Sequence, residues 1–311
     1  MKPGLSIRLA AFALAGILCG IQPCVTAQTQ NPPQSPPLDQ TPLTAEQVDD
    51  LISRTIANQH RNDVATDSFE RIEQQVSHAG SADGPITQDK TYRVVPTGSG
   101  TLKLLIRDSS KTVSDAFYRH QLRDWESILK VAVHADDPRQ VAVLAKQQKR
   151  RKDRARFIDA ARAAYEVTWL AREIRDGRVV EKLQFDPNPG YKPRGDTTDW
   201  LTHAQAIVWI DAQEAQATAL DATITRDISI GGGFLGKIYR GGHFLMQQAP
   251  AAPGIWEPTH YEYDISGRKF LFAFTMHEEV SDSHYRLLGA PEQLLAEAQN
   301  NIAHCCDVAT P

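Results

Sequence analysis

Residues 165–185 read YEVTWLAREIRDGRVVEKLQF, and this stretch decides the fold. Residues 165–174 and 178–185 are rich in β-branched and aromatic side chains, and the Asp176-Gly177 pair between them is typical of a tight hairpin turn. We therefore predict two antiparallel strands at this point of the chain.

Segments of the same kind lie on both sides of this hairpin. Gly and Asp residues, which favour turns, separate the earlier ones. No helical crossover lies between the later ones, so neighbouring strands should pair antiparallel. The predicted strands span residues 69–77, 91–96 and 101–107 before the hairpin, and 205–211, 217–225, 234–240, 243–248, 256–264 and 269–277 after it, with residues 265–268 as the last turn.

Three further stretches carry helical patterns. A Thr-x-x-Gln pattern at Thr44 has the spacing of a capping box and begins a predicted helix near residues 44–60. Residues 112–164 lose the strand alternation and are broken at residues 136–138, which predicts an inserted helical pair. A short helix near 291–303 closes the chain. The fold class is therefore α+β, with an antiparallel sheet interrupted by helices.

The N-terminus has the features of a secretory signal peptide. Lys2 and Arg8 precede an apolar run over residues 9–21, and a stretch ending in Ala27 follows it. The apolar run is too short for a membrane-spanning helix, which needs about 20 apolar residues. We predict cleavage after Ala27 and a periplasmic mature protein that is not an integral membrane protein.

The rest of the chain divides into three parts. Residues 28–43 are rich in Pro, Gln and Thr, a composition that cannot bury a core, and are predicted to form a flexible linker. Residues 44–304 hold every predicted helix and strand and are expected to form a single domain. Residues 305–311 are a tail in which Cys305 and Cys306 are adjacent, so they cannot join distant parts of the fold.

The charge balance argues against nucleic acid as a partner. The chain has 34 Lys and Arg against 38 Asp and Glu, whereas phosphate binding needs a surplus of basic residues. One basic run stands out nevertheless, and it has two interpretations. It is either a solvated helix surface or a patch for acidic lipid headgroups or an acidic envelope partner. The run includes Lys149, Arg150, Arg151, Lys152 and Arg154.

Several strand-and-turn patterns resemble a known superfamily. They are the hairpin turn at residues 175–178, the strand 180–185 leading to Asp186-Pro187, the strand 206–211, and the Ile-Trp-Glu-Pro sequence at 255–258. From about residue 66 to 288, the chain resembles uncharacterised exported proteins related to the periplasmic outer-membrane lipoprotein carriers, the Lol-type superfamily. The resemblance implies a curved antiparallel sheet that forms an unclosed barrel, with helices covering its mouth and a cavity for lipoprotein acyl chains. It implies a non-enzymatic role.

Candidate residues for such a cavity lie on one face of the predicted strand 269–277. They are Phe270, Phe272, Phe274 and Met276, with Trp169 and Trp209 as further aromatic candidates. The other face of this strand also carries apolar residues, so both faces should be at least partly covered. Either a ligand or the protein's own side chains can fill the interior, and both interpretations stay open.

Catalytic and metal motifs are weak. Residues 231–237 have the Gly and Lys spacing of a phosphate-binding loop, but Ile238 replaces the metal-binding hydroxyl and no helix follows. His260, His277 and His284 can form a zinc site only if the fold brings them together. We expect no cofactor, no bound metal and no catalytic residue.

The leading hypothesis is therefore a periplasmic, non-enzymatic binding protein that carries or senses a lipid or a lipidated protein. The first alternative is an exported structural or protein-interaction module whose barrel is filled by its own side chains. The second alternative is a metal-dependent hydrolase that uses histidines.

Overall fold

The computed structural model describes residues 38–230, 235–270 and 272–305. The predicted signal peptide, most of the predicted linker, and Cys306 with the rest of the tail lie outside the described residues.

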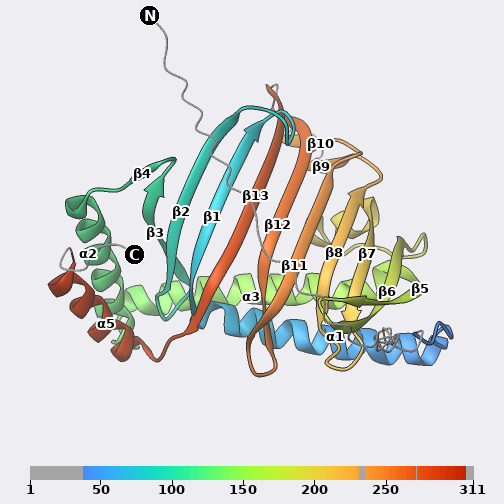
Figure 1. Cartoon of the computed structure of the whole chain (residues 1–311), viewed down its shortest axis with the longest axis horizontal. Coiled ribbons are helices and arrows are strands. Elements are labelled where there is room, and N and C mark those ends of the chain that lie inside the picture. The colour runs from blue at the N-terminus through green and yellow to red at the C-terminus, as the bar shows by residue number, and fades with distance from the viewer. Residues whose placement is uncertain (1–37, 231–234, 271, 306–311) are drawn as a thin grey trace, which may run out of the picture. The chain divides into compact units, whose positions relative to one another are not determined.

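The described chain is built on an antiparallel sheet that does not close. Its strands run in the order β4-β3-β2-β1-β13-β12-β11-β8-β7-β6-β5, and β9 and β10 pair beside the end of β12 (Figure 1). The pairing of β1 with β13 joins the first strands to the last, with Glu73 opposite Asp282. The strands are β1 (Phe69–Ala79), β2 (Ile86–Pro96), β3 (Thr101–Asp108), β4 (Lys111–Thr112), β5 (Tyr165–Arg175), β6 (Arg178–Pro187), β7 (Ala204–Asp211), β8 (Ala217–Ile224), β9 (Ile228–Ile230), β10 (Gly236–Ile238), β11 (His243–Ala252), β12 (Ile255–Lys269) and β13 (Phe272–Leu287).

The hairpin predicted from residues 165–185 is confirmed. β5 pairs with β6, and Arg175 lies opposite Arg178. Asp176 and Gly177 have φ angles of 50° and 75°. Positive φ at both central residues is what a tight hairpin turn with the right strand twist requires, and Asp-Gly tolerates it well. The predicted fold class, α+β with a curved, unclosed antiparallel sheet, is also confirmed.

The predicted turn at residues 265–268 is wrong. β12 continues through these residues, and the chain turns only after Lys269, which pairs with Phe272. Gly267 lies inside the strand, and the position requires glycine. A Cβ atom there would lie 2.3 Å from the carbonyl oxygen of Lys237 and 3.1 Å from the ring of Phe274. The glycine therefore allows a close approach of backbone and ring, whereas Phe270 adopts the positive φ of the turn, 53°.

Other strand boundaries also differ from the prediction. β2 begins at Ile86, before the predicted start at residue 91, and β11 ends at Ala252, beyond the predicted end at residue 248. β10 is only three residues long, and β9 precedes it where no strand was predicted. β13 runs ten residues beyond His277, to Leu287. Polar residues dominate that extension, so it lacks the apolar alternation by which a strand is recognised in a sequence.

The helices form largely as predicted, and the first three each begin at a side-chain cap that the sequence contains. Thr44 and Gln47 form the capping box: the backbone N–H of Gln47 donates to the Thr44 hydroxyl at 3.3 Å, and the N–H of Thr44 donates to the Gln47 side chain at 2.8 Å. The inserted pair breaks at Asp137, whose carboxylate accepts from the Arg139 N–H at 2.8 Å. The helices are α1 (Ala45–Ala65), α2 (Asp115–Ala132), α3 (Pro138–Ala164), the short α4 (Asp196–Asp199) and α5 (Pro291–His304).

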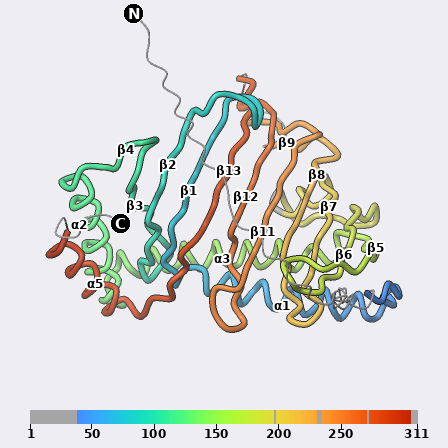
Figure 2. Tube along the Cα trace, in the orientation of Figure 1, coloured from blue at the N-terminus to red at the C-terminus, as the bar shows by residue number. Residues whose placement is uncertain are grey.

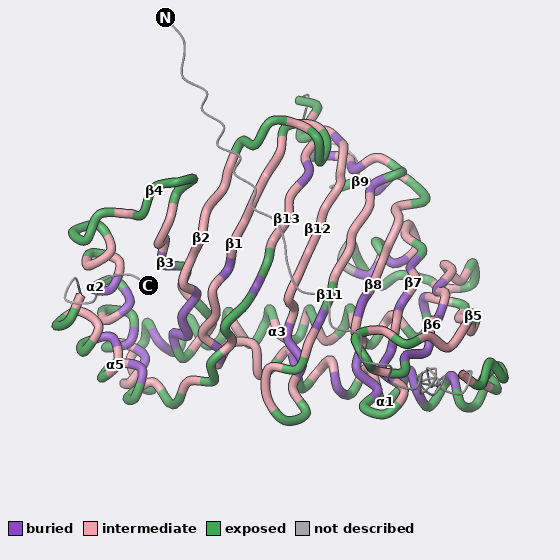
Figure 3. The backbone as a smooth tube through the Cα atoms, viewed as in Figure 1, coloured by how far each residue is buried: buried purple, intermediate pink, exposed green. Residues whose placement is uncertain are grey.

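Two apolar cores hold the helices to the sheet. In the first, Leu51 and Ile52 of α1 pack against Leu183 and Phe185 of β6 and their neighbours in β7. In the second, α2 and α5 pack together beside the β2–β3 end of the sheet, around the fully buried Trp125. Figure 2 shows α1 and α3 crossing the sheet near one end of its strands, while the β12–β13 turn lies at the other end. The residues of β1, β13 and β12 between these ends are mostly of intermediate burial (Figure 3).

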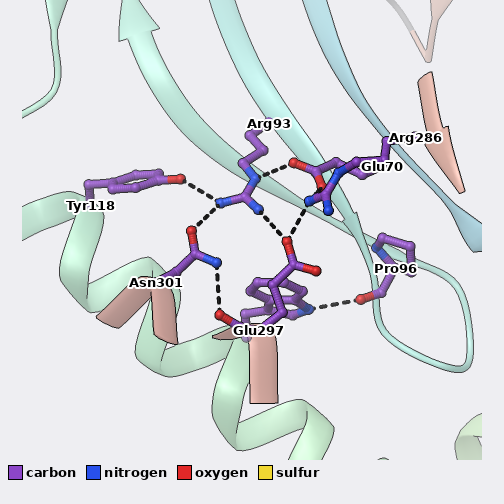
Figure 4. A network of polar contacts seen from close by, with 8 residues as sticks. Glu70, Arg93, Pro96, Tyr118, Arg286, Glu297 and Asn301 are labelled. Carbon is purple, nitrogen blue, oxygen red and sulfur yellow. Dashed lines mark hydrogen bonds and ion pairs between the residues drawn. The ribbon is translucent and has the colours of Figure 1, made fainter. Parts of the chain in front are cut away.

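A polar network fastens α5 to the sheet (Figure 4). The guanidinium of Arg93 donates to Glu70 at 2.5 Å and to Asn301 of α5 at 3.0 Å. Arg286 contacts both Glu70 and Glu297, so α5 is held from two strands. Nearby, the Trp125 Nε1–H donates to the carbonyl of Pro96 at 2.8 Å, which satisfies the one polar atom of this core side chain (Figure 4).

Candidate functional site

The sheet face that packs against α1 is the candidate binding surface, and we call it the inner face. Side chains of a strand alternate between the two faces, so the register assigns each position to one of them. The inner face begins at Leu183 and Phe185, which contact α1. Through the cross-strand pairs it continues across the sheet at Val208, Leu220, Met246, Tyr261, Val280 and Gln75.

Three of the four predicted ligand-lining residues of β13 lie on the inner face. Phe272, Phe274 and Met276 share the alternation of Val280. Phe272 is 79% exposed, and the other two are partly buried. Phe270 lies in the turn and not in the strand, and it is 46% exposed.

Further apolar side chains extend this row on the neighbouring strands. Phe244 of β11 lies against Tyr261 and Tyr263 of β12, with ring centroids 6.2 and 5.1 Å away. Ile265 lies opposite Met276. All four are only partly buried. Sequence reasoning missed Phe244 and the two tyrosines, although the Tyr-x-Tyr alternation at 261–263 was a usable signal.

The two predicted tryptophans lie on opposite faces of the sheet. Trp169 packs beside the α1 core on the inner face, and its Nε1–H donates to Glu181 at 2.7 Å. Trp209 lies on the outer face, where the guanidinium of Arg175 is 4.4 Å from its ring centroid and Lys182 is 5.2 Å away. The structure therefore does not bring the two indole rings together.

A polar pocket of about 310 Å³ adjoins the apolar row of the inner face. Read from the turn, the inner positions of β13 change from Phe272, Phe274 and Met276 to Glu278, Val280 and Asp282. The last three line the pocket, and so do Tyr261 and Tyr263. The other lining residues are Thr66, Arg71, Glu73, Gln75, Lys103, Glu257, Pro258 and Tyr285. The inner face is thus amphipathic along its strands.

Acidic groups outnumber basic groups in this pocket, with four carboxylates against Arg71 and Lys103. Arg71 pairs with Asp282 at 3.1 Å and with Glu73 at 3.5 Å, and Lys103 also pairs with Glu73. Glu257 is fully buried and accepts a hydrogen bond from the Thr66 hydroxyl at 2.8 Å.

The titration of the pocket reflects its burial and its surplus of carboxylates. Burial raises the pKa of Glu257 to about 7, and the neighbouring Asp282 acts in the same direction, against Thr66 and Arg71. Burial likewise raises the pKa of Asp282 to about 6, with Arg71 opposing the shift. Burial also raises the pKa values of Tyr261 and Tyr285. An uncharged phenol next to carboxylates donates and accepts hydrogen bonds, so the pocket suits a polar group with several donors.

A second pocket, of about 540 Å³, lies beside the β5–β6 turn and the ends of β8 and β11. Arg178 lines it, but its guanidinium already pairs with Asp211 at 3.0 Å and Glu214 at 2.8 Å. Trp256, also in its wall, donates to Glu214 at 3.0 Å. Arg178 and Trp256 are therefore engaged within the protein, whereas the inner face joins a polar pocket to a partly exposed apolar row and is the stronger candidate.

The basic run lies on α3, and part of it is paired. Arg151 contacts Asp67 at 2.9 Å, and Arg154 contacts Asp63 at 2.5 Å, so they fasten α3 to the end of α1 and to the turn that follows it. Lys149, Arg150 and Lys152 are exposed. A patch on α3 for lipid headgroups or a partner protein stays a prediction, and Lys149, Arg150 and Lys152 would have to form it.

The three histidines considered from the sequence do not meet. His277 lies opposite Asp264, whereas His260 lies opposite Ser281, four residues and about 13 Å further along the strand. His284 is exposed and pairs with its neighbour Ser283 at 3.0 Å. Burial lowers the pKa of His277, but the carboxylates of Glu279 and Asp264 outweigh it and raise the pKa above its ordinary value.

No protein-family model matches the chain, and no curated protein does. Several solved structures are similar to it. A DUF1329 family protein from Desulfovibrio piger is 12% identical, with a TM-score of 0.29 over 77% of this chain and 92% of that chain. A putative outer membrane lipoprotein-sorting protein domain from Vibrio parahaemolyticus is 9% identical, with a TM-score of 0.28 over 76% and 92% of the two chains. A LolA superfamily protein from Nitrosomonas europaea is 14% identical, with a TM-score of 0.28 over 81% and 97%.

Two of these neighbours, the lipoprotein-sorting domain and the LolA superfamily protein, have names of the superfamily that the sequence resembles. Their TM-scores are below 0.5, so no ligand and no residue role is taken from them. Within the part of the chain that the structure describes, no helix has the length and apolar character needed to cross a membrane.

Proposed function

We propose that the protein is a periplasmic, non-enzymatic carrier or sensor of a lipid or a lipidated protein, and that its inner face binds the ligand. The acyl chain lies along the apolar row, formed by Phe244, Ile265, Phe272, Phe274 and Met276. The polar group of the ligand enters the pocket beside Tyr261 and Glu278.

The observation that carries this proposal is the incomplete burial of the apolar row. α1 covers the β6–β7 part of the inner face, where Leu183 is fully buried. Phe274 and Met276, further along the same face, are only partly buried, and Phe272 is largely exposed. Exposed apolar side chains that form a continuous row are typical of binding surfaces, whereas isolated ones need no explanation.

The filled-barrel alternative predicts a different pattern. If the protein's own side chains filled the interior, the inner positions of β13 should be buried as Leu183 is, because interiors are close-packed. The partial burial of this row favours the carrier over a filled barrel. The polar end of the face is compatible with both interpretations and does not separate them.

The test is a titration with a fluorescent probe that has one acyl chain and an uncharged head. The full chain should bind it saturably, with one probe per protein. Phe274→Asp places a charge in the apolar row and should weaken binding at least tenfold, since burying an unpaired charge is costly. Leu287→Asp is the matched control, because Leu287 is 61% exposed near the other end of β13.

Two outcomes would overturn the proposal. One is the absence of saturable binding by the wild type. The other is equal binding by the wild type and Phe274→Asp, with both variants folded by circular dichroism.

A further inference from the structure

Four strands bring a row of metal-ligand types together on the outer face, away from the proposed lipid surface. His243 of β11 lies opposite Asp264 of β12, which lies opposite His277 of β13, which lies opposite His78 of β1. Directly opposed residues have Cβ atoms about 5 Å apart. The sheet register, and not sequence spacing, creates this cluster.

The next outer position along the strands adds two carboxylates. Glu262 of β12 lies opposite Glu279 of β13. The ligand atoms of Glu262, Asp264 and His277 all lie within 4.8 Å of one another. The two histidines at the ends of the row have other partners. His243 contacts Asp221 at 2.7 Å, and His78 contacts the carbonyl of Gly84 at 2.9 Å.

His277 has the kind of carboxylate partner that metal-binding histidines have. Its Nε2 lies 3.1 Å from Glu279 Oε1. A carboxylate only accepts, so Nε2 carries the hydrogen and donates it. In the neutral form of the ring, the other nitrogen, Nδ1, then has the lone pair that a metal ion needs. A carboxylate that fixes the tautomer in this way is a regular outer partner of metal-bound histidine.

The Nδ1 atom of His277 is buried and, among the described residues, makes no hydrogen bond. The whole side chain is 1% exposed. Nδ1 lies 3.4 Å from Oδ2 of Asp264. In the neutral ring, the lone pair of Nδ1 therefore lies next to a carboxylate oxygen, which is also an acceptor. Two acceptors at this distance need a cation between them: either a proton, which makes the ring an imidazolium paired with Asp264, or a metal ion that replaces the proton.

We propose that Glu262, Asp264 and His277 form a binding site for a divalent transition-metal cation of the zinc class, with a fourth position open to water. This site goes beyond the proposed lipid binding and does not depend on it. One imidazole and two carboxylates are ligand types that Zn²⁺ accepts. In a tetrahedral site with bonds of about 2.05 Å, neighbouring ligand atoms are about 3.3 Å apart, close to the observed separation of Nδ1 and Oδ2.

The carboxylates are accessible, and the histidine is not. The side chains of Asp264 and Glu262 are 43% and 30% exposed. An ion can therefore reach the site from solvent, while the buried His277 provides a fixed ligand. Because the two carboxylates are on the surface, their replacement should leave the fold intact.

The test is a competitive Zn²⁺ titration of the untagged full chain after removal of metal with a chelator. The expected result is one Zn²⁺ per chain, with Asp264→Asn and Glu262→Gln each weakening binding at least tenfold. His277→Gln should abolish stoichiometric binding, and the two carboxylate variants keep the test decisive if this buried substitution impairs folding. His284→Gln is the matched control and should bind as the wild type does, because His284 contacts Ser283 and none of the proposed ligands.

A Co²⁺-loaded sample gives a second readout, because a four-coordinate N/O site has a characteristic visible spectrum that Asp264→Asn should remove. The proposal is overturned if the wild type binds Zn²⁺ no better than Asp264→Asn, or if His284→Gln loses the ion. Failure here is distinguishable from failure of the lipid proposal, since Asp264→Asn should bind the acyl probe as the wild type does.

Discussion

Replacing Glu257 with Gln should stabilise the protein at pH 8 and have a much smaller effect at pH 5. Glu257 is fully buried in the pocket of the inner face, and burial raises its pKa to about 7 from an ordinary value of 4.5. Between these two values the unfolded chain has released its proton while the folded chain still holds it. The folded state therefore binds more protons, and stability falls as the pH rises from about 4.5 to about 7.

The size of the effect follows from the two pKa values. A folded pKa of about 7 against 4.5 penalises the folded state by about 0.8 kcal/mol at pH 5 and about 3.3 kcal/mol at pH 8. Gln carries no charge at either pH, so Glu257→Gln should remove this difference, about 2.5 kcal/mol. For a domain of this size, that corresponds to a melting-temperature difference of about 5–10 °C.

The assay is urea unfolding of the wild type and Glu257→Gln at pH 5 and pH 8. The quantity compared is the double difference, that is, the difference in unfolding free energy between the two proteins at pH 8 minus the same difference at pH 5. Any constant effect of the amide cancels in this comparison, and the Gln oxygen still accepts from Thr66 as Glu257 does. Glu166→Gln is the control, because Glu166 is exposed on β5 and should show a double difference near zero. A double difference below about 0.5 kcal/mol for Glu257→Gln would refute the reasoning, since burial would then not hold the proton on Glu257.

The remaining predictions concern the inner face and the α2–α5 core. Phe272→Ala should cost less than about 1 kcal/mol in urea unfolding, because Phe272 is 79% exposed, and it should weaken acyl-probe binding; a loss of 3–5 kcal/mol would identify a packed core ring. Trp125→Ala should cost about 3–5 kcal/mol, because Trp125 is fully buried between α2, α5 and the sheet. Among ten-carbon amphiphiles, one with a trimethylammonium head should bind more tightly than one with a sulfate head, because three carboxylates face two basic groups in the pocket even while Glu257 is protonated; calorimetry that finds the reverse order contradicts this assignment. Replacing Cys305 and Cys306 with Ser should lower the melting temperature by less than about 5 °C, since Cys305 packs only at the margin of the α2–α5 core.

Local chemistry explains which parts of the fold were predictable from the sequence. The β5–β6 hairpin has Asp-Gly at the two positions that need positive φ, and α1 has its capping box. Both signals act within a few residues. The β12–β13 turn was misplaced because Gly267 resembles a turn residue, and its actual role is set by Lys237 and Phe274, which approach it only in the folded sheet.

The site was less predictable for the same reason. Phe272, Phe274 and Met276 follow a period of two that is visible in the sequence, so their common face could be predicted. The polar pocket could not, because β13 meets β1 only through a pairing that joins residues about 200 positions apart. The cluster at His277 depends on the register of β12 with β13, which places Asp264, thirteen residues away along the chain, opposite His277. The misplaced turn between these strands hid that register.

The most direct test of the central claim is native mass spectrometry of the full chain after incubation with total envelope lipid. The account predicts a one-to-one adduct with the mass of an acylated ligand for the wild type and for Leu287→Asp, and its loss for Phe274→Asp. A wild-type spectrum that contains only the bare chain, or the same adduct on Phe274→Asp, would contradict ligand binding on the inner face.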